Sequence, residues 1–211
     1  MESPFRVNLV GTDGSGKSTV LDLLRAKFES DEQSVVCHNP SGITYPNPIP
    51  YESKTNPENQ PWEVYGLTRM DRASCVESAA ISIAEQYNAV LLGDRDFSIC
   101  HPVYYPVLMA ESELADITQN EWQNRFVSAR KCGPADSIFW LDVDPGVAVE
   151  RIENGDRTRI QPHEKQETIV RLRAGYAEME RTSAGGIIRI DTTSCSAEEV
   201  RDQIWAILQS I

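Results

Sequence analysis

The chain has 211 residues, 40% of them hydrophobic, and a formal net charge of -12. This length suits one large α/β domain. The acidic charge argues against long nucleic acid as a partner, because such binding rests on Lys and Arg neutralising phosphates, and no apolar run approaches the ~18 residues of a membrane span.

The start of the chain and its cysteines indicate the compartment. Met1–Arg6 lacks the basic start and the apolar stretch of a secretory signal. The five cysteines are scattered and contain no Cys-x-x-Cys pair, which fits reduced thiols. We therefore expect a cytoplasmic protein with no membrane contact and no metal site beyond the Mg²⁺ that a nucleotide brings. A small nucleotide is compatible with an acidic chain, because local cations and backbone N–H groups can hold it.

Short apolar runs alternate with helix-length sequence, which predicts successive βαβ units in one domain over residues 1–211. The predicted strands are Phe5–Val10, Ser34–Cys37, Ala89–Gly93, Ser137–Val143 and Gly186–Ile190. The predicted helices are Ser18–Phe28, Trp62–Tyr87, Ser112–Lys131, Pro145–Ile152, His163–Arg181 and Ala197–Leu208. Asp144 and Ser196 are the expected N-caps of the helices that follow them. Five parallel strands are therefore expected.

The segment from about 39 to 61 has a different composition. It holds six of the twelve prolines, at positions 40, 46, 48, 50, 57 and 61. Proline lacks an N–H and fixes φ, so an extended, irregular excursion is predicted here. Long loops in compact domains are often functional, and a surface insertion without function is the alternative that stays open.

A phosphate-binding loop follows the first predicted strand. Gly11-x-x-x-x-Gly16-Lys17-Ser18 matches the Walker A pattern, with a strand before it and a helix after it. The glycines let successive N–H groups point at phosphates, Lys17 reaches the β and γ phosphates, and Ser18 ligates Mg²⁺. The residues predicted to bind ATP in this loop are Gly11, Asp13, Gly14, Ser15, Gly16, Lys17, Ser18 and Thr19.

Two further motifs carry charge at expected strand ends. Leu91-Leu-Gly-Asp94-Arg95 ends an apolar strand at the edge where α/β proteins bind ligands. Asp94 is a candidate to hold a Mg²⁺ water or orient the acceptor, and Arg95 to neutralise the transferring phosphoryl group. A lid at about 153–163 carries Arg157 and Arg159, which suit phosphate binding over a closed site. Ordinary surface ion pairs are the alternative for both motifs.

Together these motifs resemble the thymidylate kinase family over nearly the whole chain. The resemblance rests on the Asp-Gly-Ser-Gly-Lys-Ser-Thr loop, on Asp71-Arg72-Ala73, on Asp94-Arg95, on Leu141-Asp-Val-Asp-Pro-Gly-Val-Ala-Val-Glu-Arg151, and on the lid arginines. Glu164 and Tyr176 fall where the family places such residues. It implies a P-loop NTPase fold, a three-layer α/β/α sandwich with a five-stranded parallel sheet and an arginine-containing lid. A homodimer formed through helices is implied as well.

The resemblance also implies roles for single residues. Asp13 would contact the acceptor sugar, Arg72 the acceptor phosphate, and Arg95 the phosphates during transfer. Arg151 would contact the adenine of ATP. Gly14 stands where some members of the family carry a transfer-assisting arginine. That cation would then come from the lid, from Arg157 or Arg159.

Three departures from the family pattern concern the acceptor. The family's Arg-Glu-Pro-Gly-Gly-Thr-like stretch reads His38-Asn-Pro-Ser-Gly-Ile-Thr44, and Thr68 replaces a base-stacking phenylalanine. The segment after Arg95 is one residue short and contains Pro102. The leading hypothesis is therefore a nucleoside monophosphate kinase that uses ATP and Mg²⁺ on dTMP or a related small nucleotide. The alternatives are a kinase of a nucleoside or another small hydroxyl compound, and a non-catalytic nucleotide-binding module.

Overall fold

The computed structural model describes most of the chain outside the Pro-rich segment and the region around residues 96–132. The described residues are 3–39, 42–45, 49–50, 62–95, 103, 133–155, 164–183 and 186–211, with backbone alone for 44–45, 49–50 and 62–74. The predicted helix Ser112–Lys131 and most of the predicted lid lie outside these residues. None of the helices in the described ranges has the length and apolar character needed to cross a membrane.

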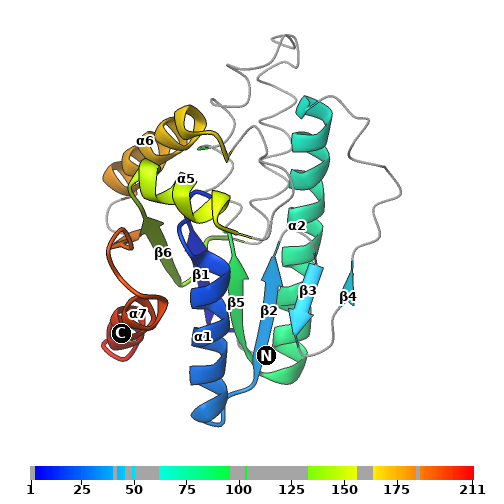
Figure 1. Cartoon of the computed structure of the whole chain (residues 1–211). Coiled ribbons are helices and arrows are strands. Elements are labelled where there is room, and N and C mark those ends of the chain that lie inside the picture. The colour runs from blue at the N-terminus through cyan, green and yellow to red at the C-terminus, as the bar shows by residue number, and fades with distance from the viewer. Residues whose placement is uncertain are drawn as a thin grey trace.

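A mixed β-sheet forms the centre of the molecule (Figure 1), with strand order β4-β3-β2-β5-β1-β6-β7. Five neighbouring strands of that order, β2-β5-β1-β6-β7, are parallel to one another. The strands are β1 (Arg6–Val10), β2 (Val35–Asn39), β3 (Gly42–Tyr45), β4 (Ile49–Pro50), β5 (Val90–Asp94), β6 (Ser137–Asp142) and β7 (Ile188–Asp191). Nearly every residue of β1, β2 and β6 is buried, as parallel strands covered on both faces require.

The expected strand count was wrong, because the sheet in the described residues has seven strands and not five. The five predicted strands are the parallel ones, and two short antiparallel strands, β3 and β4, lie inside the segment predicted to be irregular. Proline-based reasoning excludes only central strands, because a residue without an N–H is tolerated at a sheet edge. Pro50 lies in β4, the outermost strand, where it faces Gly42 of β3.

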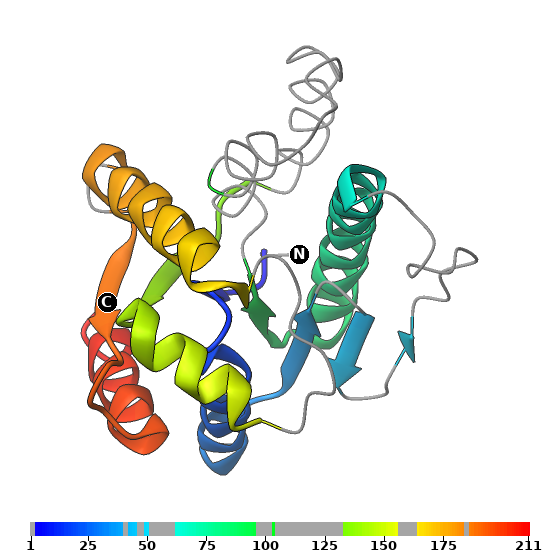
Figure 2. The same cartoon turned by 45° about the horizontal axis from the view of Figure 1, so that its top comes forward.

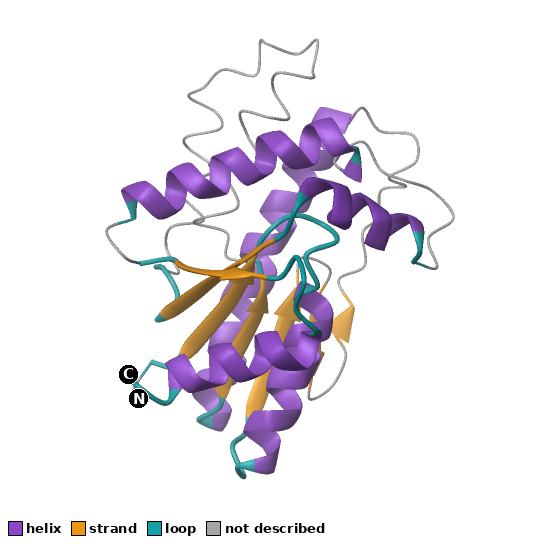
Figure 3. Cartoon of the chain, turned by 60° about the vertical axis from the view of Figure 1, so that its left-hand side comes forward, coloured by secondary structure: helices purple, strands orange, loops and turns teal. Residues whose placement is uncertain are grey.

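Helices cover both faces of the sheet (Figure 3), giving three layers. The helices are α1 (Lys17–Ser30), α2 (Trp62–Tyr87), α5 (Pro145–Glu153), α6 (Gln166–Thr182) and α7 (Ala197–Leu208). One face packs against α1 and α7 through Leu24 and Ile204. The other packs against α2 and α6, through Ala80 and Tyr176 respectively. The predicted helices over these ranges are confirmed to within about three residues at each end.

Local sequence explains where several of these helices begin. Asp144 accepts hydrogen bonds from Gly146 N and Val147 N, and Pro145 follows it, so the predicted cap of α5 is confirmed. Ser196 forms a capping box with Glu199 at the start of α7. The N-cap residue of α1 is Gly16, which has no side chain to cap the helix. The first N–H groups of α1 are therefore available to an external anion.

The chain order places a ligand site at the carboxyl ends of the strands. From β1 the chain moves to β2 and β5 on one side, and then to β6 and β7 on the other. Such a reversal creates a crevice at the carboxyl edge of an α/β sheet, which is where these folds bind ligands. Figure 2 looks toward this edge, with α5 and α6 on the β6 side and α2 on the β2 side.

Candidate functional site

The loop between β1 and α1 has a backbone that side chains would obstruct. Gly11, Gly14 and Gly16 have φ angles of 144°, 79° and 88°, in the region that favours glycine. A Cβ added to Gly14 would overlap the carbonyl oxygen of Ala148 and lie 2.9 Å from its carbonyl carbon. Helix α5 is therefore packed directly on the loop. With α5 in this position there is no room for a side chain at Gly14.

Lys17 is buried and is held by the loop that it follows. It is 6% exposed, and its Nζ donates to Thr12 O over 2.7 Å and reaches Ser15 Oγ at 3.5 Å. An ammonium group in this position lies beside the uncapped N-terminus of α1. The lysine and the helix end thus place positive charge at one point, where a phosphate chain would be stabilised.

Ser18 and Asp94 meet although 76 residues separate them. The Ser18 hydroxyl donates to Asp94 Oδ2 over 3.2 Å. Asp94 Oδ1 is buried and has no hydrogen-bond partner among the described residues. A hydroxyl and a carboxylate oxygen form the kind of oxygen donor set that Mg²⁺ takes beside a phosphate chain. The residues present therefore fit that ion, directly or through its water. No group of three or more His, Cys, Asp or Glu that could hold another metal occurs in the described ranges.

Arg95 joins the end of β5 to the phosphate loop. Its Nη2 donates to Asp13 Oδ1 over 2.9 Å, and the two side chains are 21% and 12% exposed. Its backbone N–H donates to Leu9 O over 2.8 Å, and its φ angle is 85°. A non-glycine residue in the left-handed region costs of order 1–3 kcal/mol and persists where surrounding contacts enforce it. The contacts to Asp13 and Leu9 supply that enforcement.

Arg151 joins α5 to two other segments of the site. Its Nη2 donates to Thr192 O over 2.8 Å and to Thr193 O over 3.2 Å, and its Nη1 donates to Gly14 O over 3.4 Å. Through these hydrogen bonds the guanidinium connects helix α5 both to the loop after β7 and to the phosphate loop.

Thr192 is a site residue that the sequence reasoning missed. Its hydroxyl lies 3.0 Å from Asp142 O and 3.3 Å from Ser15 O, and its N–H donates to Asp142 O over 2.7 Å. It is 2% exposed. A Thr-Thr pair that begins two residues after the predicted strand Gly186–Ile190 was the available signal, since that position falls at the ligand-binding edge.

Asp142 was quoted in the sequence only as part of a family motif, and it proves to be a buried ionic centre. It is 1% exposed, accepts from Arg173 at 2.7 and 2.9 Å, and accepts from Arg189 at 3.0 and 2.5 Å. Its hydrogen bond raises the pKa of Arg173. Arg189 also lies over the ring of Trp140, 5.1 Å from its centroid. The carboxylate thus ties α6 and β7 to the end of β6.

The remaining predicted residues are placed only partly. Thr68 and Arg72 lie in α2, where the backbone alone is described, and Arg157 and Arg159 fall outside the described residues. Ser15 is buried in the loop and Thr19 is exposed on α1. Glu164 is 1% exposed just before α6, and Tyr176 stacks on Trp140 in the core with ring centroids 6.0 Å apart. Tyr176 is therefore a packing residue in this structure.

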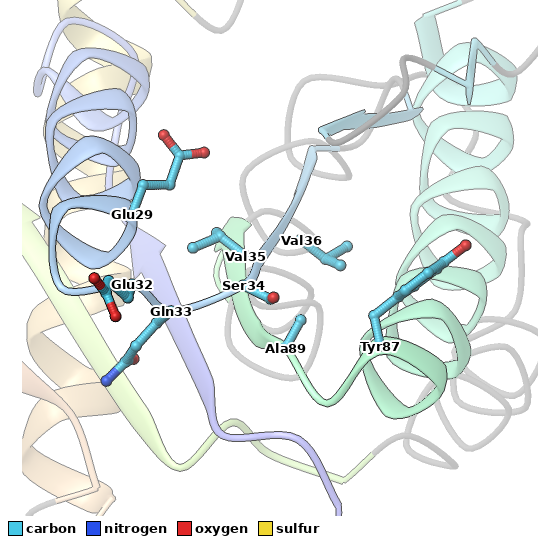
Figure 4. Close-up of a pocket in the computed structure, with 8 residues that line it drawn as sticks. All are labelled: Glu29, Glu32, Gln33, Ser34, Val35, Val36, Tyr87 and Ala89. Atoms are coloured by element: carbon cyan, nitrogen blue, oxygen red, sulfur yellow. The ribbon is translucent and has the colours of Figure 1, made fainter.

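A pocket of about 440 Å³ lies at the amino ends of the strands, away from the carboxyl edge that holds the phosphate loop (Figure 4). It is lined by the end of α1, the amino ends of β2 and β5, and the end of α2. The lining residues are Glu29, Glu32, Gln33, Ser34, Val35, Val36, Tyr87 and Ala89. Two carboxylates and no cation line it, so this pocket is unsuited to phosphate and is separate from the site at the carboxyl edge.

A glycine-rich loop at the reversal point of a parallel sheet, with a buried lysine and a Ser–Asp pair beside it, is the arrangement of a P-loop NTPase. The family model for thymidylate kinase matches residues 9–204, and the chain belongs to the thymidylate kinase family. The expected family and the expected P-loop α/β fold are confirmed. As a member of this family, the protein is an ATP-dependent phosphotransferase of the nucleotide kinase type.

Individual relatives agree with this assignment. A thymidylate kinase of Exiguobacterium sp. is 30% identical over 214 residues, which cover 96% of this chain and 95% of the relative. A thymidylate kinase of Coprothermobacter proteolyticus is 27% identical over 184 residues, covering 87% and 88%. A solved deoxyadenosine kinase from M. mycoides with bound dATP superposes with a TM-score of 0.66 at 15% identity, covering 97% of this chain and all of that one. This last likeness concerns the fold alone.

Proposed function

We propose that the protein transfers the γ-phosphoryl group of ATP, bound with Mg²⁺, to dTMP or a closely related nucleoside monophosphate. The observation that carries the proposal is the Ser18–Asp94 contact of 3.2 Å beside the buried Lys17. This arrangement brings a metal-binding pair and a phosphate-binding cation together at the carboxyl edge of the sheet, in a chain of the thymidylate kinase family. Phosphoryl transfer needs mainly positioning and charge stabilisation, which these groups can supply.

On the donor side, the P-loop N–H groups and Lys17 would hold the triphosphate. Ser18 and Asp94 would hold Mg²⁺, which neutralises charge on the phosphates during transfer. Arg151 would lie against the adenine, as the family resemblance implies. The contacts of Arg151 to Thr192 O and Thr193 O support this, because they fix its guanidinium at the rim of the loop.

On the acceptor side, Asp13 would contact the acceptor sugar, and Arg72 with Thr68 would line the acceptor pocket. Arg95 would stabilise charge on the phosphates during transfer. The packing of α5 against Gly14 supports a further assignment, because it excludes a side chain there. The transfer-assisting cation would then come from Arg157 or Arg159, and such an arginine can be worth ~10³-fold in rate.

A panel assay would test the proposed reaction. ADP release would be measured with ATP and Mg²⁺ against a set of nucleoside monophosphates and the matching nucleosides. We expect turnover with dTMP or a close relative and none with nucleosides. Lys17→Ala should abolish it, whereas Lys27→Ala, an exposed lysine of the same helix that pairs with Asp31, should leave it unchanged. If none of the monophosphates is turned over, the proposal is wrong.

The main alternative is a kinase of a nucleoside or another small hydroxyl compound. A nucleoside needs no clamp for an acceptor phosphate, so Arg72→Ala would leave its turnover nearly unchanged. A monophosphate kinase would lose most of its kcat/KM for the acceptor in the same variant. ATP binding without transfer to any acceptor would instead indicate a non-catalytic nucleotide-binding module.

We also propose that the protein acts in the cytoplasm as a homodimer that uses α2. The described part of this helix turns small side chains outward at Cys75, Ser78, Ala79 and Ser82, which lets a second helix approach closely. An arginine at the centre of this face, Ala79→Arg, should convert a dimer into a monomer in sedimentation experiments. A wild-type chain that sediments as a monomer at micromolar concentration would contradict the proposal.

A further inference from the structure

Three residues lie side by side on the three strands that carry the site. Asn8 of β1 faces Gly93 of β5, and Gly93 faces His38 of β2. This row of Asn8, Gly93 and His38 lies one residue before the carboxyl edge of the sheet, because Asp94 and Arg95 follow Gly93 directly. Asn8 is 0% exposed and His38 is 4% exposed. Two polar side chains are therefore buried in the middle of a sheet whose other strand residues are mostly apolar.

Gly93 is the point at which these two side chains converge. A Cβ added to Gly93 would lie 2.6 Å from His38 Nε2 and would overlap Asn8 Oδ1. The imidazole and the amide thus reach over the glycine from opposite sides and occupy the space that any other residue would fill. Real Cβ atoms do not approach other atoms so closely, so this arrangement requires glycine. Close packing of this kind transmits small displacements.

The converging side chains lie on the sheet face opposite the metal pair. Side chains alternate along a strand. Val36 and Leu91, each two residues before a member of the row, pack on Val76, Ala80 and Ala84 of α2. Asp94 points the other way, toward Ser18 on α1. Asn8 and His38 therefore contact the backbone of β5 at Gly93 from the face covered by α2. The next side chain of β5, that of Asp94, lies on the face covered by α1.

We propose that Asn8 and His38 are positioning residues that brace Gly93 and so set the places of Asp94 and Arg95. The inference rests on the proposed function, because it concerns the metal pair and the arginine of that site. The end of β5 is a demanding place in the backbone, because Arg95 bonds to Leu9 O through its N–H and has a φ angle of 85°. A buried amide or imidazole is costly unless it is hydrogen-bonded, so these two side chains require a more specific arrangement than apolar groups of similar size. A brace for the reacting edge explains their presence.

Kinetics of brace variants would test the inference. In Asn8→Ala and His38→Ala, kcat should fall by about tenfold or more, within the ~10²-fold that a misplacement of about 1 Å can cost. The Mg²⁺ concentration for half-maximal rate should rise, and KM for ATP should change little. His38→Gln places an amide nitrogen near the position of Nε2 and should restore most of kcat and of the Mg²⁺ response.

Val36→Ala is the matched control. It shortens a side chain of the same strand as His38, on the same face and two residues farther from the carboxyl edge, and it removes packing against α2. It should lower the Tm and leave the Mg²⁺ response unchanged. If Asn8→Ala and His38→Ala keep the wild-type kcat and Mg²⁺ response, or if Val36→Ala reproduces their defect, the brace is overturned. A wild-type chain without phosphotransferase activity would instead count against the proposed function.

A compensating variant approaches the same contact from the other side. Gly93→Ala should reduce kcat and raise the Mg²⁺ requirement, because its methyl group displaces β5 from Asn8 and His38. Adding Asn8→Ala removes the closest obstacle, so the double variant should recover part of the thermal stability lost by Gly93→Ala. Equal stability of the single and double variants would contradict the convergence on Gly93.

Discussion

The Ser18 hydroxyl donates a hydrogen bond of 3.2 Å to Asp94 Oδ2, which joins the first turn of α1 to the end of β5. The remaining oxygen, Asp94 Oδ1, is buried without a hydrogen-bond partner in the described part of the chain. Leaving a buried carboxylate oxygen unsatisfied costs free energy. A bound cation would remove that cost, which supports the proposed role of this pair in holding Mg²⁺.

Asp94→Asn should weaken the response to Mg²⁺. The amide can still accept from Ser18, so the local structure should persist while the negative charge is lost. We expect a tenfold to 100-fold loss of activity at limiting Mg²⁺, as for other residues that orient a metal's water. The measurement is rate against free Mg²⁺ at saturating ATP. Asp22→Asn, which changes an exposed residue of α1, is the control. An unchanged Mg²⁺ curve in Asp94→Asn would rule out the metal role.

Gly14→Ala should destabilise the protein more than Gly133→Ala. Both glycines have positive φ angles, 79° and 67°, so both substitutions incur the backbone penalty of about 1 kcal/mol. Gly133 has nothing within 4 Å of an added Cβ, whereas Gly14 is opposed by the backbone of Ala148. The difference between the two Tm changes therefore isolates the contact with α5. Equal losses would show that the loop and α5 separate easily, and that a side chain at position 14 is permitted.

Arg173 and Arg189 should be separately dispensable and jointly required for stability. Each is more than one-third exposed, so solvent screening limits the cost of either single Met substitution to about 1 kcal/mol. The double variant leaves Asp142 buried and uncompensated, which should cost about 3–5 kcal/mol. Urea unfolding of the two singles and the double gives this coupling directly. Arg181→Met, which breaks an exposed pair with Glu178 on α6, should cost little. Additive losses would contradict the shared carboxylate.

Sequence patterns predicted the parts of this fold that depend on local periodicity. The ends of α2 and α7 match the expected bounds, because apolar spacing and the Ser196 cap are local signals. β3 and β4 were missed because antiparallel pairing at an edge depends on a neighbouring strand and not on the composition of the segment itself.

In the site, too, residues that belong to local motifs were predicted, and residues that depend on the pairing of strands were not. Lys17, Ser18 and Asp94 were predicted from motifs, and the structure brings them to one edge of the sheet. Thr192 was not predicted, because its part in the site depends on β7 pairing with β6 so that its hydroxyl reaches Asp142 O and Ser15 O. Asn8 belongs to no motif, and His38 was noted only in the stretch that departs from the family pattern. Their meeting over Gly93 follows only from the strand order β2-β5-β1.

Cys37 should make the protein less stable as the pH rises above about 9. Burial raises the pKa of this thiol from 9.0 to about 12, against a smaller lowering by Arg25. In the unfolded chain the thiol ionises near its ordinary pKa, while in the folded chain it keeps its proton. The stabilising difference is therefore complete below pH 9 and is lost as the pH rises toward 12. At its steepest this loss is about 1.4 kcal/mol per pH unit.

The experiment compares the wild type with Cys37→Ala by urea unfolding under reducing conditions between pH 8 and 11. Lysines and tyrosines titrate in the same range in both proteins, so the difference between their slopes reports Cys37 alone. We expect the wild type to lose stability with pH more steeply than the variant. Cys75, which is exposed, should react with a thiol reagent in the folded protein, whereas Cys37 should react only on unfolding. Parallel slopes, or rapid labelling of Cys37 in the folded state, would show that β2 opens to solvent far more readily than its packing between α1 and β5 implies.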